Sequence, residues 1–216
     1  MKKLLVMIAL LPAVAFANTS TIKGSAPIDP SDQASLQRGA RTFVNNCLNC
    51  HSANYMRYNR LVDIGLTKEE IEDNLLFAAE KVGDTMQVAM DPADAKKWFG
   101  VAPPDLTLEV RAKGADWVYA YMRGFYKDET TPSGWNNIVF DKVAMPHVLY
   151  ELQGEQVLNH KTHELELVKP GQLSPSEYNA YVGDLTNFMA YMAEPAKEQR
   201  KRIGLWVLFF LGIMFV

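Results

Sequence analysis

Both cysteines of the chain lie in one pentapeptide, Cys47-Leu48-Asn49-Cys50-His51. Two thiols three residues apart can form a redox-active dithiol or a disulfide. The histidine that follows favours a different chemistry, because Cys-x-x-Cys-His is the motif at which c-type haem is attached. In that chemistry the two thiols add to the haem vinyl groups, and His51 presents its imidazole to the iron. We therefore predict covalent haem attachment, with the dithiol as the alternative.

A second iron ligand decides what such a haem can do. Iron held by His alone is open to small ligands, whereas His and Met together give an electron carrier with a raised potential. Among the 10 Met residues, Met145 is favoured because Pro146 follows it in a stretch rich in turn-forming residues, which suits a ligand on a loop. Met86 and Met90 remain alternatives. His147 is a rival ligand that we expect instead at the surface or in a hydrogen bond.

Two predicted helices would position the attachment motif. The first begins at a cap formed by Ser31 or Asp32 and leads into Cys47 with apolar residues at helical spacing. The second begins at residues 174–177 (Ser-Pro-Ser-Glu), which combine an N-cap Ser, a Pro at the first helical position and a Glu that completes a capping box. Gly39 lowers the stability of the first helix, so we expect the second helix to cross closely there.

The rest of the chain predicts further helices and little sheet. Thr67 opens a capping box before one helix, and Asp116 can start another. Val157–Val168 is predicted to form a short hairpin, in which His160 and His163 are expected to be solvated. No segment alternates long enough for a large sheet. The predicted fold is therefore mainly α: a single-haem c-type cytochrome domain with a short β-hairpin.

The N-terminus is typical of an exported protein. Lys2 and Lys3 precede an apolar run from Leu4 to Phe16, and small residues follow it at a cleavage-like spacing. These features predict a cleaved signal peptide over residues 1–17. Export agrees with haem attachment, because bacterial c-type haem is attached outside the cytoplasm.

The C-terminus indicates a membrane anchor. Ile203–Val216 contains 14 residues without a charge, and a helix of this length covers about 21 Å, less than the hydrocarbon core of about 30 Å. We expect residues 195–216 to form a truncated C-terminal transmembrane helix. Residues 18–194 are then expected to form the haem domain in the periplasm.

Charge is distributed unevenly along the chain. The whole chain has a net charge of −3 and a pI near 5.8, which argues against a nucleic-acid binder. Residues 18–193 carry 16 basic and 23 acidic residues, whereas residues 194–202 carry four basic and two acidic ones. We call residues 18–193 the acidic body. Its net negative charge predicts electrostatic steering of a basic partner.

Several motifs together resemble the cytochrome c1 family in its proteobacterial form, over nearly the whole chain after the signal peptide. Haem attachment alone is shared by many families, but these motifs in this order are much more specific. They are Cys47 to His51, Ala102-Pro103-Pro104-Asp105-Leu106, Gly134-Trp135-Asn136-Asn137, Ala144-Met145-Pro146-His147, and the passage from Glu194-Pro195 to Arg202-Ile203-Gly204.

The resemblance implies roles for particular residues. Cys47 and Cys50 would form the thioether bonds of one haem c, and His51 and Met145 would be the axial ligands of its iron. Residues 103–104 (Pro-Pro) would line the proximal side, where a backbone carbonyl can orient the histidine.

Arg111 would pair with a haem propionate, with an ordinary surface salt bridge as the alternative. The family usually has a Tyr where this chain has Trp117, so a propionate hydrogen bond from that position would require the indole N–H.

The resemblance also implies a function and partners. The chain would be the electron-transfer subunit of the quinol–cytochrome c reductase, a proton-translocating complex that is dimeric in the family. It would pass electrons from the Rieske iron–sulfur subunit to a soluble or membrane-bound cytochrome c, beside cytochrome b in the bacterial inner membrane. It would perform no bond-making chemistry of its own. An anchored cytochrome of another pathway is the first alternative, and a haem enzyme or gas sensor with an open iron site is the second.

Overall fold

The structure is a computed structural model that describes residue 22 and residues 24–215. The predicted signal peptide lies outside these residues. The described part is mainly helical, which confirms the predicted class, but it holds three short antiparallel strand pairs where the sequence indicated one hairpin. The helices are α1 (Gln33–Thr42), η2 (Phe43–Cys47), η3 (Tyr58–Ile64), α2 (Lys68–Asn74), α3 (Pro92–Phe99), α4 (Glu109–Lys113), α5 (Ala115–Arg123), α6 (Tyr150–Gln153), α7 (Pro175–Ala193) and α8 (Lys197–Phe215). The strands are β1 (Ala53–Arg57), β2 (Thr85–Met86), β3 (Phe125–Lys127), β4 (Trp135–Asn137), β5 (Gly154–Asn159) and β6 (Glu164–Pro170).

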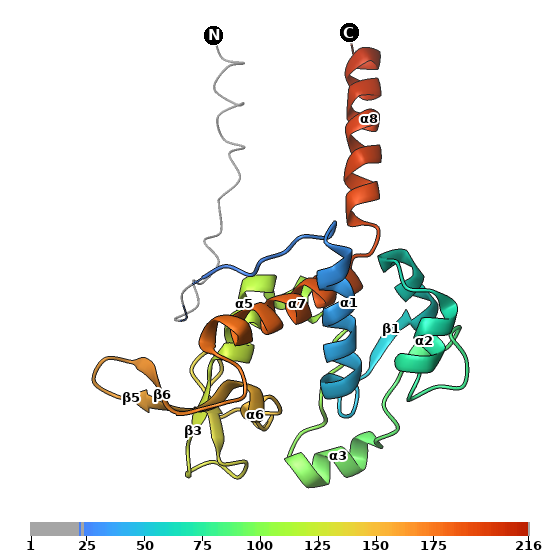
Figure 1. Cartoon of the computed structure of the whole chain (residues 1–216). Coiled ribbons are helices and arrows are strands. Elements are labelled where there is room, and N and C mark those ends of the chain that lie inside the picture. Colours follow the sequence, from blue (N-terminus) through green and yellow to red (C-terminus); the bar gives the residue numbers. More distant parts are fainter. Residues whose placement is uncertain (1–21, 23, 216) are drawn as a thin grey trace, which may run out of the picture.

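The crossing of α1 and α7 forms the centre of the domain (Figure 1). Asp32 caps α1, as predicted, by accepting a hydrogen bond from the backbone N–H of Ser35 at 2.9 Å. The two helices approach closely at Gly39, where an added Cβ would lie 2.1 Å from the backbone oxygen of Asp184. The predicted close crossing is therefore confirmed, and glycine is required there because any side chain would collide with the α7 backbone.

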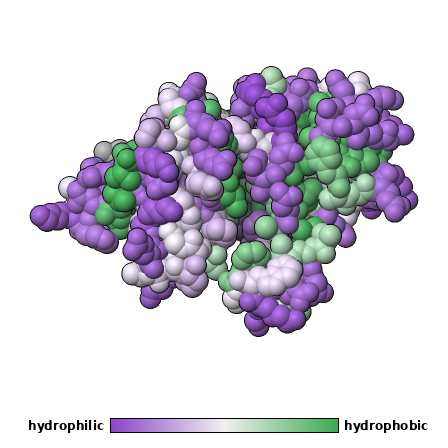
Figure 2. Space-filling view, turned by 60° about the horizontal axis from the view of Figure 1, so that its bottom comes forward, coloured by the Kyte–Doolittle hydropathy of each residue, from purple (hydrophilic) through white to green (hydrophobic). Residues whose placement is uncertain are grey.

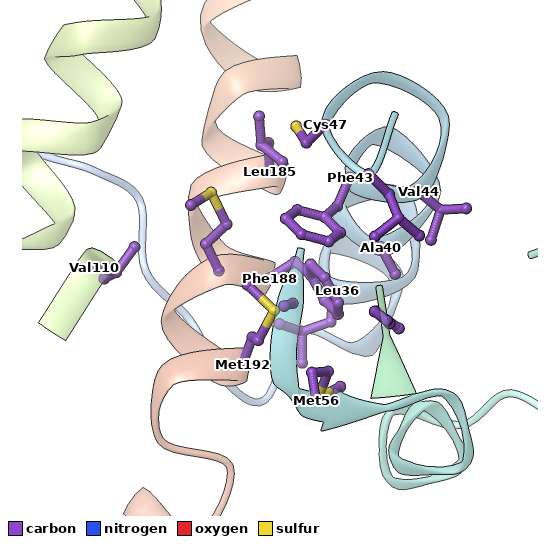
Figure 3. Close-up of a cluster of buried hydrophobic side chains, with 14 of the residues drawn as sticks. Leu36, Ala40, Phe43, Val44, Cys47, Met56, Val110, Leu185, Phe188 and Met192 are labelled. Atoms are coloured by element: carbon purple, nitrogen blue, oxygen red, sulfur yellow. The ribbon is translucent and has the colours of Figure 1, made fainter. Parts of the chain in front are cut away.

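Apolar side chains from both helices fill the crossing. Phe43, at the start of the π-helical turn η2, and Phe188 on α7 have ring centroids 5.8 Å apart. Both rings are completely buried, and Figure 3 shows them pointing toward each other between the helices. This core fixes the end of η2, and thereby places Cys47 at the edge of the cluster.

The capping residues of α7 and α2 form as predicted. Ser174 and Glu177 exchange side-chain to backbone hydrogen bonds at the start of α7, and Thr67 and Glu70 do the same at α2. Helix α2 begins directly after Thr67 and ends at Asn74.

The strands form three pairs, of which one lies beside α1 and the other two lie together near α6 (Figure 1). β1 pairs with β2, β3 with β4, and β5 with β6, all antiparallel. The third pair is the predicted hairpin, extended at both ends relative to Val157–Val168. The first two pairs are too short to show alternation in the sequence, which explains why they were not predicted.

Helix α8 projects away from the rest of the described structure (Figure 1). Its apolar side chains from Ile203 onward are exposed. A helix thus forms where an anchor was predicted. Among the described residues, however, none of the helices combines the length and apolar character needed to cross a membrane. The structure supports the helix but not the transmembrane span predicted for it.

Candidate haem-binding site

The attachment motif begins where η2 ends. The backbone N–H groups of Cys50 and His51 both donate to the carbonyl of Cys47, at 3.0 and 2.9 Å. This tight turn follows directly from the helix that the α1–α7 core holds in place. Both thiols are free, that of Cys47 buried and that of Cys50 partly exposed. The motif therefore places two cysteines that form no disulfide, together with an imidazole, within a single turn.

The environment of these thiols is unlike that of a redox-active dithiol. Burial raises the pKa of Cys47 to about 12, and it also raises the pKa of Cys50. Reactive cysteines of redox motifs have lowered pKa values, because a nearby positive charge or helix N-terminus stabilises the thiolate. The raised pKa values of both thiols therefore disfavour the redox-active dithiol as the alternative.

His51 is fixed by a backbone carbonyl. Its Nδ1 lies 2.8 Å from the oxygen of Pro104, and because a carbonyl can only accept, Nδ1 donates. In the neutral ring this leaves Nε2 with the lone pair that a metal requires. Burial lowers the pKa of His51, which favours the neutral form. The ring is thus held in the tautomer that a metal ligand requires.

The segment that carries Pro104 is itself anchored to the chain that follows His51. The carboxylate of Asp105 accepts hydrogen bonds from the backbone N–H of Asn54 at 2.7 Å and of Thr107 at 2.9 Å. The N–H of Leu106 donates to the carbonyl of Ser52 at 2.9 Å. These contacts explain why a polar residue follows the two prolines: it closes the loop against β1.

Met145 lies on the loop between β4 and α6, residues 138–149, which we call the Met145 loop. Its side chain is half-buried and packs against both apolar clusters of the described structure, the large one around α1 and α7 and a small one on β3 and β4. Its Sδ accepts a hydrogen bond from the hydroxyl of Tyr121 at 3.5 Å. Of the two alternatives, Met86 is completely buried in the main core and Met90 is half-buried outside it.

Two asparagines organise the Met145 loop. The side chain of Asn136 accepts from the backbone N–H of Lys142 at 2.8 Å and donates to Asp128 and Asp141 at 3.0 and 2.9 Å. Asn137 donates through Nδ2 to the carbonyl of Tyr121 at 2.8 Å. Both asparagines are buried, so they connect the loop to β4 and α5 from the inside.

The structure corrects the expectation for His147. Its side chain is 2% exposed, and both ring nitrogens lack a hydrogen-bond partner within the described residues. The ring stacks on Phe125 with centroids 4.7 Å apart and meets the edge of Trp135 at 5.0 Å. His147 is therefore buried rather than at the surface, and its ring packs between aromatic side chains beneath the loop.

Arg111 and Trp117 lie on α4 and α5, after the loop that orients His51. Arg111 is exposed, and no carboxylate of the described residues lies within salt-bridge distance of it, so the surface salt bridge is not formed. Trp117 is half-buried and stacks on Tyr121, with centroids 5.0 Å apart. The Nζ of Lys113 lies 5.5 Å above the indole ring.

The segments beside these residues present apolar side chains to solvent. Val101 and Leu108 flank the prolines and are 47% and 48% exposed, and Phe140 and Val148 flank Met145. Apolar patches interrupt the hydrophilic surface on the face that Figure 2 brings forward. A haem is an apolar macrocycle with two carboxylates at one edge. Apolar side chains suit its faces, and the guanidinium of Arg111 suits a carboxylate. The residues present therefore fit a haem.

Tyr121 and the two asparagines were missed as functional candidates. A tyrosine at helical spacing among apolar residues indicates an ordinary core position, and its partner lies 24 residues further along the chain. The asparagines carried part of the family resemblance, but their role as supports of the Met145 loop emerges only from their contacts.

The fold and the attachment turn define a class of protein, the single-haem c-type cytochromes. The family model described as "Cytochrome C1 family" matches residues 23–86 and 77–216. The chain is 51% identical to cytochrome c1 of Allochromatium vinosum, over 89% of this chain and 83% of that protein. It is also 51% identical to a protein of Nitrosomonas europaea named ammonia monooxygenase gamma subunit, over 97% of this chain and 90% of that protein. Mitochondrial cytochrome c1 of Saccharomyces cerevisiae is 26% identical over 89% of this chain and 66% of that protein.

This chain belongs to the cytochrome c1 family. It carries a covalently bound haem c and transfers electrons as the haem subunit of the cytochrome bc1 complex, a membrane-associated oxidoreductase.

Proposed function

We propose that the haem is attached through Cys47 and Cys50 and that its iron is held between His51 and Met145. The observation that carries this proposal is the 2.8 Å hydrogen bond between His51 Nδ1 and the carbonyl of Pro104, which leaves Nε2 as the ligand atom of an already fixed ring. When bound, the haem supplies one-electron exchange between ferrous and ferric iron. The task of the chain is to hold both ligands in place in each oxidation state.

Further residues would shape the surroundings of the group. Pro103 and Pro104 line the proximal side, where the carbonyl of the second proline holds the imidazole. Arg111 pairs with a propionate, because its guanidinium is exposed and has no carboxylate partner among the described residues. Trp117, which replaces the family's usual Tyr, offers an indole N–H as a second donor to a propionate.

The proposed electron path runs from a Rieske iron–sulfur subunit, through this chain, to a soluble or membrane-bound cytochrome c. Membership of the cytochrome c1 family supports this direction. Cytochrome b would be the neighbouring subunit, and the complex would be dimeric. Because the donor and the acceptor must each approach the haem, the chain needs a docking surface near the haem edge. The negative charge of the acidic body would attract a basic acceptor.

The proposed arrangement has three parts: a signal peptide over residues 1–17, a periplasmic haem domain over 18–194 and a membrane anchor over 195–216 in the bacterial inner membrane. The exposed apolar surface of α8 supports the last part, because an apolar helix surface is unfavourable in water and stable in lipid. The basic residues of segment 194–202 would lie at the membrane surface, between the periplasmic domain and the anchor.

Copurification tests the proposed assembly. The full chain with a C-terminal tag is extracted from its membranes in mild detergent, and the associated proteins are identified by mass spectrometry. We expect cytochrome b and a Rieske protein in stoichiometric amounts, together with quinol-dependent reduction of cytochrome c. Isolation of the chain with neither partner would contradict the proposal.

A second candidate is a role in a different electron-transfer pathway. One observation supports it, which is the name of the Nitrosomonas europaea relative. In that case the chain would be an anchored cytochrome that serves an ammonia-oxidising system. The same experiment separates the two functions, because monooxygenase subunits would then replace cytochrome b and the Rieske protein.

A further inference from the structure

Tyr121 provides a polar contact to the proposed second ligand. Its hydroxyl donates a hydrogen bond to Met145 Sδ at 3.5 Å, between helix α5 and the Met145 loop. A thioether sulfur has two lone pairs, so it can accept a hydrogen bond through one and bind iron through the other.

The tyrosine ring is held on several sides. Trp117 stacks on one face with centroids 5.0 Å apart, and Phe125 presents its edge at 5.2 Å. The backbone carbonyl of Tyr121 also accepts from Asn137 at 2.8 Å, which connects the same residue to β4 and thus to the Met145 loop. These contacts hold Tyr121 in the position from which its hydroxyl meets the sulfur.

We propose that Tyr121 tunes the reduction potential of the haem through its hydrogen bond to Met145, an inference that rests on Met145 as the axial ligand. The bond draws electron density from the sulfur, which makes it a weaker donor to ferric iron. Ferrous iron is then relatively favoured, so the hydrogen bond raises the potential. Tyr121 acts through the ligand and is a positioning and tuning residue.

The test is a redox titration of the haem absorption in membranes that contain the full haem-loaded chain. The variant Tyr121→Phe keeps the ring and its stacking but removes the donor. Loss of about 1 kcal/mol of hydrogen bonding corresponds to about a fivefold lower ferrous-to-ferric ratio at a fixed ambient potential, or about 40 mV. We expect this downward shift while the methionine–iron charge-transfer band of the ferric protein persists.

Tyr119→Phe is the matched control. Tyr119 lies on the same helix, and its hydroxyl donates to the carbonyl of Asn179 at 3.3 Å instead of to the sulfur. It should leave the potential unchanged, and an equal shift in both variants would overturn the proposal, as would no shift in Tyr121→Phe.

A third variant separates the failure of this inference from that of the proposed site. If Met145→Leu removes the charge-transfer band while Tyr121→Phe leaves the potential unchanged, the ligand assignment stands and the tuning role is wrong. If Met145→Leu leaves the band intact, the assignment of the ligand is wrong and the tuning role falls with it.

Discussion

The proposed ligands His51 and Met145 are each held by a contact to a residue distant in sequence. The imidazole is held by the carbonyl of Pro104, and the sulfur by the hydroxyl of Tyr121. The buried amide of Asn136 supports the second ligand indirectly, by holding the backbone of Lys142 within the Met145 loop. The stability of the site thus depends on polar groups that never touch the iron.

Replacement of Asn136 by alanine should loosen the Met145 loop. The change removes an acceptor from the backbone N–H of Lys142 and a donor from Asp128 and Asp141. Because the residue is buried, we expect the free energy of unfolding to fall by about 2 kcal/mol. Urea unfolding of the haem-loaded chain in detergent measures this. Asn74→Ala, at the exposed end of α2, is the control and should change stability by less than about 0.5 kcal/mol; equal effects would contradict the account.

The spacing of residues in the sequence was sufficient to identify some functional side chains and not others. Cys47, Cys50 and His51 were recognisable because haem attachment requires adjacent residue types in a fixed order. Tyr121 was not, because its function depends on a contact between α5 and a loop. His147 was expected at the surface or in a hydrogen bond, but its ring is buried and stacks on Phe125, a contact that spacing in the sequence does not reveal.

At the scale of elements, the site depends on the crossing of α1 and α7. Caps at Asp32 and Ser174 fix where each helix begins, and these starts set the register of the crossing. Gly39 allows the backbones to touch. Since η2 continues α1 directly into Cys47, a shift in the crossing would move the attachment motif.

A side chain at Gly39 should force the two helices apart. The Cβ of an alanine would lie 2.1 Å from the oxygen of Asp184 and 2.6 Å from the Cβ of Phe188. We expect Gly39→Ala to destabilise the haem-loaded chain by about 3 kcal/mol, as overpacking of a buried contact does. Thermal unfolding followed by haem absorption measures the loss.

Gly83→Ala is the control, because an added Cβ there meets no atom within 4 Å. The account would be contradicted if Gly39→Ala were as stable as this control.

Helix starts were predictable because capping side chains act on neighbouring backbone groups. Ser174 with Glu177, and Thr67 with Glu70, are local signals of this kind. Strand pairs β1–β2 and β3–β4 could not be foreseen, because segments of two to five residues pair through tertiary contacts rather than through a sequence pattern.

At the scale of the whole molecule, charge and hydropathy are separated along the chain. Residues 18–193 have a net charge of −7, and the basic segment 194–202 leads into the apolar part of α8. The acidic body suits attraction of a basic electron acceptor, and the basic segment suits a headgroup layer.

Electron transfer to a basic cytochrome c should slow as salt rises. Long-range attraction between an acidic body and a basic partner is screened as the Debye length falls from about 10 Å at 0.1 M to about 3 Å at 1 M ionic strength. The measurement is the second-order rate constant by stopped flow across this range. An acidic cytochrome c is the control, and it should show no such decrease. A flat dependence with the basic acceptor would refute steering.

The central claim is that Met145 completes a six-coordinate iron. The most direct measurement is the ferric absorption spectrum of Met145→Leu beside that of Met90→Leu, together with carbon monoxide binding to the reduced proteins. The account predicts that Met145→Leu alone loses the methionine–iron charge-transfer band and gains rapid carbon monoxide binding. A charge-transfer band that survives in Met145→Leu, or rapid carbon monoxide binding by the unmodified protein, would contradict it.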